Sequence, residues 1–321
     1  MKNYFIAALW FTIMLAGCQQ SEDIENFNEK LLMSIEASIG ESTDGRYVSS
    51  DNTLNNLSFT NNDAIGVSVN DKGFIKWTYN GSSWNSSNGI VYWDDKTSDH
   101  TFKAFYPYAN VEKDGDIPMP DLSGQTGEMS YVANKDFLVA EKTQKYTENN
   151  GFVSLTGTNA FHHVSSLVQI TLKGEGDLLN ASIENIKLTG TDIISPATYN
   201  FGAQNKVIVT TDENGNVIDL NLSDYTITSE GKTFHFIVNA GTTELSNVSL
   251  TITYMSGNKS YTATLASLGS NSQCFEKGKQ YKYNIKVADG ILTISGNSIV
   301  NWTDGFTMED IIINGVENNN Q

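Results

Sequence analysis

The sequence predicts an all-β protein with two antiparallel β-sandwich domains in tandem. Glycine occurs 26 times, asparagine, serine and threonine are abundant, and charged residues make up only 18% of the chain. Short alternating apolar runs are separated by turn residues, which is the pattern of strands that bury one face. The length of 321 residues favours two domains over one. We therefore expect pairs of antiparallel sheets packed face to face.

The chain begins with the pattern of a lipoprotein signal peptide at residues 1–17. Lys2 precedes an apolar run at residues 5–15, and the run ends in the lipobox Leu15-Ala16-Gly17-Cys18. We expect cleavage before Cys18 and lipidation of that residue. The run is shorter than the ~20 residues that span a bilayer, so the sequence predicts a lipid anchor rather than a membrane helix.

The mature chain is expected to be acidic and to fold without disulfides. The chain has 37 acidic and 20 basic residues, and processing would remove only Lys2 from this count. Such a surface repels nucleic acid, which excludes it as a partner. Residues 18–30 are polar and acidic and suit a tether. Cys274 is the only cysteine besides Cys18, so stability must come from apolar burial.

The first folded element is expected at residues 33–39. Four apolar residues alternate there with polar ones, which is the period of a half-buried strand: Met33, Ile35, Ala37 and Ile39. The competing interpretation is a helix whose apolar face consists of Ile24, Phe27, Leu31 and Ile35.

The first sandwich is expected at residues 31–157. Its further strand candidates are residues 65–69, 74–79, 91–93 and 102–106. Three turn signals punctuate them, because Asn and Gly tolerate the positive φ of tight turns: Asp71-Lys72-Gly73, Asn80-Gly81 and Asn88-Gly89. Residues 109–132 hold two of the four prolines and are expected to form a long loop.

The second sandwich is expected at residues 158–321, with the boundary near Gly157. Apolar residues again alternate, over residues 164–172, 183–188, 234–238 and 248–254. The purest alternation in the chain is that of Tyr281, Tyr283, Ile285 and Val287. Each of these strands is expected to bury one face and expose the other.

The sequence shows no constellation of catalytic, metal-binding or cofactor-binding residues. None of the four histidines has the spacing of metal ligands, and the pair His162-His163 precedes a predicted strand, where a structural hydrogen bond is expected. Residues 212–216 (Asp-Glu-Asn-Gly-Asn) read as a hairpin turn, because the glycine falls at the fourth rather than the sixth position of a calcium loop. We expect no enzyme, no metal and no cofactor.

An aromatic cluster and a single arginine admit more than one interpretation. Five aromatic residues could stack on sugars or pack in the core: Trp77, Tyr79, Trp84, Tyr92 and Trp93. Tryptophans exposed along one groove would indicate glycan binding, and buried ones would not. Arg46 is the only arginine in the chain and follows Asp44-Gly45 in a polar stretch. Taken by itself, it reads as a solvated surface cation.

Several stretches occur in order along the chain and together carry a family resemblance: the lipobox, Asn62-Asp63-Ala64-Ile65-Gly66-Val67, Phe102-Lys103-Ala104-Phe105-Tyr106-Pro107-Tyr108, Asp136-Phe137-Leu138-Val139-Ala140, Phe161-His162-His163, Phe275-Glu276-Lys277-Gly278-Lys279-Gln280-Tyr281-Lys282-Tyr283 and Ile299-Val300-Asn301-Trp302-Thr303-Asp304-Gly305. In these stretches the chain resembles the fimbrillin family, the lipoprotein precursors of surface (type V) pili in Gram-negative bacteria. Asn62, where the family often has glycine, departs from the pattern only in a turn.

This resemblance implies two transthyretin-like β-sandwich domains and a lipidated precursor sorted to the outer membrane. It also implies cleavage by an arginine-specific surface protease, and Arg46 occupies a position like the family's cleavage site. Cleavage would free the strand of Met33, Ile35, Ala37 and Ile39. The groove left behind would expose unpaired backbone groups until a strand of a neighbouring subunit enters. A candidate donor is the C-terminal stretch around Ile311, Ile312 and Ile313.

The sequence therefore predicts a structural and adhesive surface protein. It would be a fimbrillin-like pilus subunit, or an anchor or tip protein, whose partners are other pilus subunits, the outer membrane and ligands on host or bacterial surfaces. The alternative is a stand-alone surface lipoprotein that binds glycan through exposed aromatics.

Overall fold

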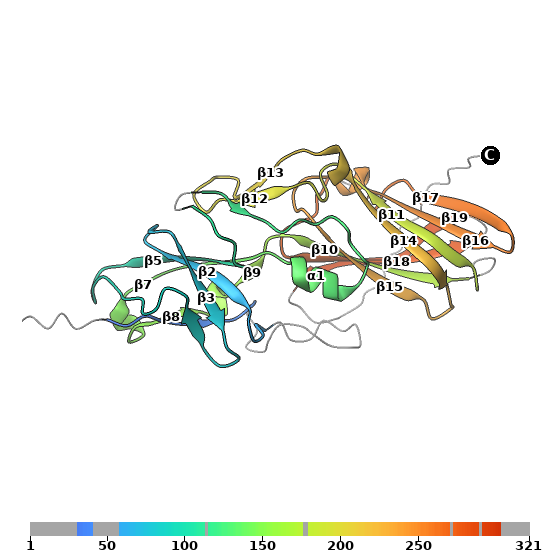
Figure 1. Cartoon of the computed structure of the whole chain (residues 1–321). Coiled ribbons are helices and arrows are strands. Elements are labelled where there is room, and N and C mark those ends of the chain that lie inside the picture. Colours follow the sequence, from blue (N-terminus) through green and yellow to red (C-terminus); the bar gives the residue numbers. More distant parts are fainter. Residues whose placement is uncertain are drawn as a thin grey trace, which may run out of the picture. The chain divides into compact units, whose positions relative to one another are not determined.

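The structure is a computed structural model that describes residues 31–40, 58–112, 115–175, 179–269, 272–288 and 291–302. Strands dominate these residues, and α1 (Met129–Lys135) is the only α-helix among them (Figure 1). None of the helices in the described ranges is long and apolar enough to cross a membrane. The all-β prediction is confirmed.

A six-stranded antiparallel sheet organises the N-terminal part of the fold. In spatial order its strands are β4 (Trp84–Ser86), β3 (Phe74–Tyr79), β2 (Ala64–Val69), β5 (His100–Tyr106), β7 (Leu138–Gln144) and β9 (His162–His163). The predicted strands at residues 65–69, 74–79 and 102–106 are confirmed. The expected strand at residues 91–93 is reduced to one bridge, between Tyr92 and Leu32.

One face of this sheet is covered by β1 (Ser34–Ala37) and β8 (Phe152–Leu155), which form a two-stranded sheet. The alternation at residues 33–39 therefore does form a strand, and the helical interpretation is wrong there. β1 runs parallel to β8, whereas we expected antiparallel pairs. The apolar side chains between these layers form one core cluster.

The other face of the six-stranded sheet is covered by a three-stranded sheet of β13 (Val207–Val209), β12 (Ala197–Tyr199) and β6 (Ile117–Pro118). Phe105, Phe137 and Val139 pack there against Ile117 and Tyr199. β6 and α1 lie within or next to residues 109–132, so the expected long loop is only partly a loop. Pro118 is accommodated because its strand has a partner on one side only.

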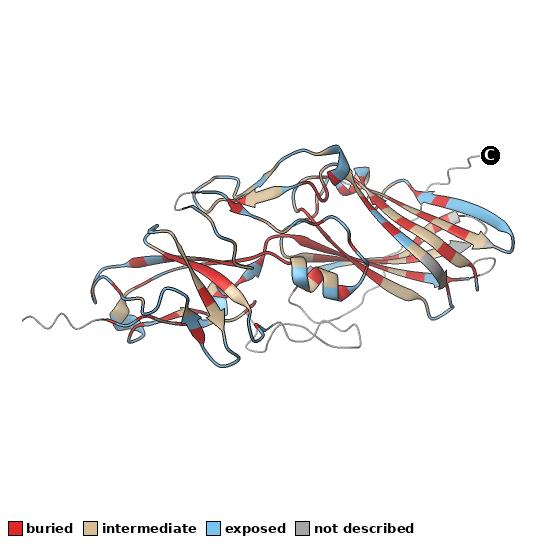
Figure 2. Ribbon diagram, viewed as in Figure 1, coloured by how far each residue is buried: buried red, intermediate tan, exposed pale blue. Residues whose placement is uncertain are grey.

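The C-terminal part is a sandwich of two four-stranded sheets. One contains β15 (Lys232–Val238), β10 (Ser166–Gly174), β18 (Lys279–Ala288) and β19 (Ile291–Asn301). The other contains β14 (Val217–Thr226), β11 (Ser182–Thr189), β16 (Ser249–Ser256) and β17 (Lys259–Leu265). Buried residues of both sheets form the largest core cluster (Figure 2). The division into domains at residue 157 stays a prediction.

Burial in this sandwich differs from the expectation along β10. The alternation expected over residues 164–172 would expose every second residue, yet Thr171 and Lys173 are the only residues of β10 that are not buried. β10 pairs in parallel with β18, and Gln280 on β18 donates its side-chain amide to the Gln169 Oε1 atom at 2.9 Å. The prediction of one exposed face is therefore wrong for this strand, which buries side chains on both faces of its sheet.

Residues before and within α1 also pack against the C-terminal core, through Leu122, Met129 and Val132. The Gln125 side chain lies at the edge of β15: its amide nitrogen donates to the Ile237 carbonyl at 2.7 Å, and its amide oxygen accepts from the Ile237 N–H at 3.0 Å. One side chain thus pairs both backbone groups of one edge-strand residue, and the His235 N–H on the same edge donates to the Gly127 carbonyl at 2.8 Å.

Four short 3₁₀ helices complete the described elements: η1 (Tyr146–Glu148), η2 (Gly157–Asn159), η4 (Glu213–Asn216) and η5 (Leu245–Asn247). η4 replaces the hairpin turn that we expected at residues 212–216. The Asp212 carboxylate accepts a hydrogen bond from the Asn214 N–H at 2.9 Å, which caps the start of η4. The Asp212 side chain therefore acts as the N-cap of η4.

Candidate functional site

Strand β1 is held on one side by β8. The two strands are in parallel register over all four residues of each. At the start of β1 the Ser34 N–H donates to the Gly151 carbonyl at 3.2 Å, and just after its end the Ser38 N–H donates to the Leu155 carbonyl at 3.0 Å. The strand is therefore attached to β8 over its whole length.

The opposite edge of β1 is attached near its beginning to the stretch that contains Tyr92. The Met33 N–H donates to the Val91 carbonyl at 2.9 Å, and the Trp93 N–H donates to the Leu31 carbonyl at 2.9 Å. The first residues of the segment thus lie between two neighbours. Removing them would leave unpaired backbone groups on both sides.

The hydrogen bonds continue past β1 to Phe161. The Phe161 N–H donates to the Ser38 carbonyl at 2.9 Å, and the Gly40 N–H donates to the Phe161 carbonyl at 2.7 Å. Ile39 and Phe161 form a parallel bridge. The attached segment therefore extends from residue 31 to residue 40.

The inward face of this segment belongs to the N-terminal core. Met33 and Ile35 are each 6% exposed and Ile39 is 2% exposed, in one cluster with Trp93 and Phe161. Ala37 is partly buried against the same cluster. Burying a side chain such as Ile or Met contributes about 1.5–3 kcal/mol, as an upper estimate. The segment is thus a full member of the core, although it lies near one end of the chain.

The outward face of the same region carries exposed apolar side chains. Leu32 is 56% exposed, and its partner Tyr92 is 37% exposed. Phe152, which pairs with Ser34, is 50% exposed, and Ile90 is 65% exposed. Ile90 lies two residues before Tyr92 in the sequence. We call Leu32, Ile90, Tyr92 and Phe152 the outer patch. Clustered exposed apolar residues are typical of interaction surfaces.

Gly151 makes the close approach of β8 to this segment possible. Its φ is +86°, and a Cβ atom there would meet the Leu32 carbonyl oxygen at 2.9 Å and the Tyr146 ring at 2.7 Å. The Gly151 carbonyl accepts a hydrogen bond from the Trp93 indole N–H at 3.0 Å. One glycine therefore positions both the strand and the buried tryptophan.

The aromatic cluster that suggested glycan binding lies mostly inside the protein. Trp77, Trp84 and Trp93 are 4%, 8% and 4% exposed. Tyr79 is partly buried beside Trp84, with ring centroids 5.2 Å apart. Only Tyr92 of the five is exposed, in the outer patch. The tryptophans do not line an open groove, and this burial is the arrangement that the pilus interpretation expects.

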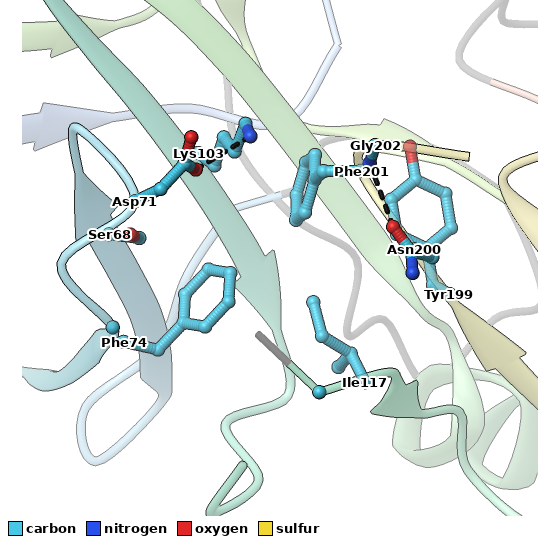
Figure 3. Close-up of a pocket in the computed structure, with 11 residues that line it drawn as sticks. Ser68, Asp71, Phe74, Lys103, Ile117, Tyr199, Asn200, Phe201 and Gly202 are labelled. Atoms are coloured by element: carbon cyan, nitrogen blue, oxygen red, sulfur yellow. Dashed lines mark hydrogen bonds and ion pairs between the residues drawn. The ribbon is translucent and has the colours of Figure 1, made fainter. Parts of the chain in front are cut away.

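A cavity of about 240 Å³ lies between the six-stranded sheet and the chain around β12 (Figure 3). Phe74, Ile117 and Phe201 form its apolar wall. The Lys103 ammonium donates to the Asp71 carboxylate at 2.6 Å. Because this ion pair is formed within the cavity wall, we interpret the space as a gap between two packed layers rather than a ligand site.

The predicted structural hydrogen bond of the histidine pair is confirmed at His163. Its Nδ1 atom lies 2.8 Å from an Asp136 carboxylate oxygen, and its ring stacks on Trp302 with centroids 4.1 Å apart. Among the described residues, no group of three or more His, Cys, Asp or Glu side chains could hold a metal ion.

The remaining predicted site residues lie outside the described ranges. These are the lipidation residue Cys18, the cleavage candidate Arg46 and the donor candidates Ile311, Ile312 and Ile313. Sequence reasoning missed Gly151, β8 and the outer patch. The stretch Asn149-Asn150-Gly151 was an available turn signal before β8, but no sequence signal identifies β8 as the partner of a strand more than 100 residues earlier.

Comparison with known proteins gives consistent results. A family model described as Fimbrillin-like matches residues 48–302. The chain is 25% identical over 313 residues to a protein of Bacteroides uniformis named "Putative fimbrium subunit Fim1C", and the match covers 95% of this chain and 96% of that protein.

Two crystal structures share the fold. One is described as a "putative cell adhesion protein" of Bacteroides uniformis, with a TM-score of 0.60 at 20% identity, covering 86% of this chain and 99% of that one. The other is a fimbrial protein of Bacteroides vulgatus, with a TM-score of 0.51 at 17% identity, covering 85% and 99%.

Proposed function

Because the chain belongs to the Fimbrillin-like family, whose model matches residues 48–302, we propose that it is assembled into a fimbrium by strand exchange after proteolysis near Arg46. It would act as a subunit or as an anchor or tip protein. The family consists of fimbrial and adhesion proteins rather than enzymes, and a fimbrium is a cell-surface appendage. We also propose that the chain forms two domains, residues 31–157 and 158–321.

The observation that carries the proposal is the attachment of β1. Loss of the segment would leave the Val91, Gly151 and Leu155 carbonyls without their partners from this segment. It would also uncover the core around Phe161. Unpaired buried polar groups cost about 1–3 kcal/mol each, so the emptied groove is unstable until another strand enters. A strand from a second subunit can restore both the hydrogen bonds and the buried apolar surface.

The position of Arg46 in the chain fits this role. β1 and Gly40 precede it, and the described chain resumes at Ser58. Cleavage after Arg46 would therefore break the covalent link between β1 and the rest of the protein. β1 would then be held by hydrogen bonds and packing alone, which is the condition under which another strand can replace it.

The candidate donor lies at the other end of the chain. Ile311, Ile312 and Ile313 follow β19 and Trp302 in sequence. They are β-branched and apolar, like Ile35 and Ile39, and such residues favour strands. We propose that this stretch enters the groove of a neighbouring subunit, which is a copy of this chain or a related pilus protein.

The order of the sites along the chain couples anchoring to assembly. Lipidation at Cys18 would tether the precursor to the outer membrane through residues 18–30. Because Cys18 and β1 both precede Arg46, one cut would separate the lipid and the strand from the subunit together. An uncut molecule would stay anchored with its groove closed, which suits a base or anchor role.

The outer patch gives a neighbouring molecule a further surface beside the groove. Three of its residues lie at the start of β1, where a strand that replaces β1 would enter or leave: Leu32, its bridge partner Tyr92, and Phe152, which pairs with Ser34. Contact with pilus subunits there would cover apolar surface that is exposed in the isolated chain. We also propose that the protein adheres to ligands on host or bacterial cells.

The test uses the fact that Arg46 is the only arginine. An arginine-specific protease has one possible cleavage site in the entire chain. We expect the treated wild-type protein to lose the β1 segment and to form ladders in gels of unheated samples. Arg46→Lys keeps the charge and should remain uncut and monomeric. Equal ladders from both proteins would contradict the proposal, as would a cut wild-type protein that retains its β1 segment.

A further inference from the structure

A second cavity, of about 620 Å³, is lined by four separate stretches of chain. They are His162 and Val164 at β9, the hairpin between β12 and β13, residues 240–242, and Lys277. The hairpin is closed by the Asn200 N–H, which donates to the Lys206 carbonyl at 2.7 Å. A volume of this size lies in the range of about 300–1,000 Å³ that is usual for small-molecule sites.

The charged residues that line the cavity are both lysines, in a protein with a net charge of −17. Its lining contains Lys206 and Lys277 but no aspartate or glutamate. Lys206 forms an ion pair with Glu141, which lies outside the lining. Lys277 makes no hydrogen bond or ion pair with the residues that the structure describes. One uncompensated ammonium group therefore faces the space.

His162 adds a group that can either donate or accept a hydrogen bond. Burial lowers its pKa below the usual 6.5, and electrostatic interactions with Lys277, His163 and Lys206 lower it further, against an opposing effect of Glu141. The imidazole is therefore neutral at neutral pH. An anion bound beside it would offset the lysine charges and raise this pKa.

The remaining lining combines free amide groups with an apolar wall. The side chains of Gln204 and Asn205 have no hydrogen-bond partner within the described ranges. Val164, Tyr199 and Val207 supply apolar surface. The lining therefore offers amides for hydroxyl groups, an apolar wall for the face of a ring and an ammonium for a carboxylate. One class of ligand carries all three of these groups. The cavity in Figure 3 differs, because its one lysine is paired with an aspartate of the same wall, whereas Lys277 here has no such partner among the described residues.

We propose that this cavity binds an acidic saccharide, with its carboxylate on Lys277, beside the Lys206–Glu141 ion pair, and its hydroxyl groups on Gln204, Asn205 and His162. No residue of β1 or β8 lines the site, although His162 directly follows Phe161, which borders the strand-exchange groove. It would give the protein a ligand-binding activity that does not depend on proteolysis at Arg46. An uncut monomer should therefore bind as well as an assembled one.

The test measures binding of two probes, N-acetylneuraminic acid and glucuronic acid, to the uncut protein by saturation-transfer NMR and calorimetric titration. We expect binding of at least one of them and weaker binding of glucose and sodium acetate. The double variant Lys206→Gln/Lys277→Gln should lower the affinity by about ten-fold or more, because charge-assisted hydrogen bonds are lost. The pKa of His162, followed by NMR, should rise when the probe is added.

The matched control is Lys72→Gln/Lys187→Gln, which removes the same charge from two surface ion pairs, with Asp94 and Asp219. It should bind like the wild type. Three results would overturn the proposal: no binding of either probe at millimolar concentration, acetate or glucose bound as tightly as the acidic sugars, or an equal loss of affinity in both double variants. Because the assay uses uncut monomer, its outcome is separate from that of the strand-exchange test.

Discussion

A methyl group at Gly151 would meet the carbonyl oxygen of Leu32 at 2.9 Å, in the stretch that leads into β1. Contacts below about 3.0 Å require the backbone to shift, and the backbone on both sides is hydrogen-bonded. Gly151 also has a positive φ, which strains any L side chain. The attachment of β1 therefore depends on one residue that bears no side chain.

We predict that Gly151→Ala weakens the attachment of β1. The matched control is Gly81→Ala, because Gly81 has φ +90° but nothing within 4 Å of its added Cβ. Both variants incur the strain of a positive φ, of order 1 kcal/mol, whereas only Gly151→Ala also disturbs Leu32. Urea denaturation should show the larger loss for Gly151→Ala, and hydrogen exchange at Ser34 and Ser38 should accelerate only in that variant. Equal losses and equal exchange would argue against it.

The histidine pair shows how far residue-level prediction reaches. The local sequence indicated a structural hydrogen bond, and the contact of His163 with Asp136 confirms it. The identity of the partner could not be predicted, because Asp136 lies 27 residues earlier and the strand pairing of β7 with β9 brings the two together. The sequence indicates that a side chain will form a hydrogen bond. Which residue is its partner depends on how the strands pair.

At the scale of elements, period-2 alternation located nine of the nineteen strands in the described part of the chain. β3 has the predicted bounds, and the inward residues Tyr281, Tyr283 and Ile285 of β18 are buried. Glycine turns also lie where expected, with positive φ at Gly73, Gly81 and Gly89. These features are local consequences of which side chains face the core.

Elements whose partners are side chains or distant segments were missed. Residues 109–132 looked like a loop because prolines interrupt them, yet they contain β6 and bring Gln125 to the edge of β15. An edge strand normally presents unpaired backbone groups to solvent. Here the Gln125 amide occupies one donor and one acceptor of Ile237, so the segment closes the edge without forming a strand.

We predict that Gln125→Met destabilises the protein by about 1–3 kcal/mol, because both backbone groups of Ile237 lose their partner inside the protein. Methionine keeps the length of the side chain, so the loss reports hydrogen bonds rather than volume. Gln204→Met, at an exposed position, is the control and should leave the unfolding free energy nearly unchanged. Chemical denaturation of both variants provides the measurement. A Gln125→Met protein as stable as the control would refute this account of the edge.

At the scale of the whole molecule, the layered all-β architecture followed from the pattern, but the connections between distant segments did not. β6 pairs with β12 from the other side of the predicted domain boundary. β1 with β8 and β10 with β18 are parallel pairs. An alternating pattern indicates that a strand packs one face on a core. It does not indicate which strand lies beside it or in which direction that neighbour runs.

The candidate site shows the same limit. The sequence identified the strand of Met33, Ile35 and Ile39 and its inward residues, and these are buried. It could not identify β8, Gly151 or the outer patch, since each depends on the three-dimensional neighbours of β1. The strand in the assembly proposal could therefore be predicted from local sequence, whereas its groove is defined only by the fold.

The most direct measurement of this account is a reversible lock on β1. Ile35 and Val153 are register partners, and adjacent strands lie about 4.7–4.9 Å apart, a separation that a disulfide can bridge. The variant Ile35→Cys/Val153→Cys also carries Cys274→Ser, which removes the free thiol, and Ile35→Cys alone is the control. While the disulfide is formed, β1 should stay attached after cleavage at Arg46. We predict that the oxidised, cleaved protein remains monomeric and that reduction releases β1 and produces ladders. Ladders of equal extent in the oxidised and reduced protein would contradict the account.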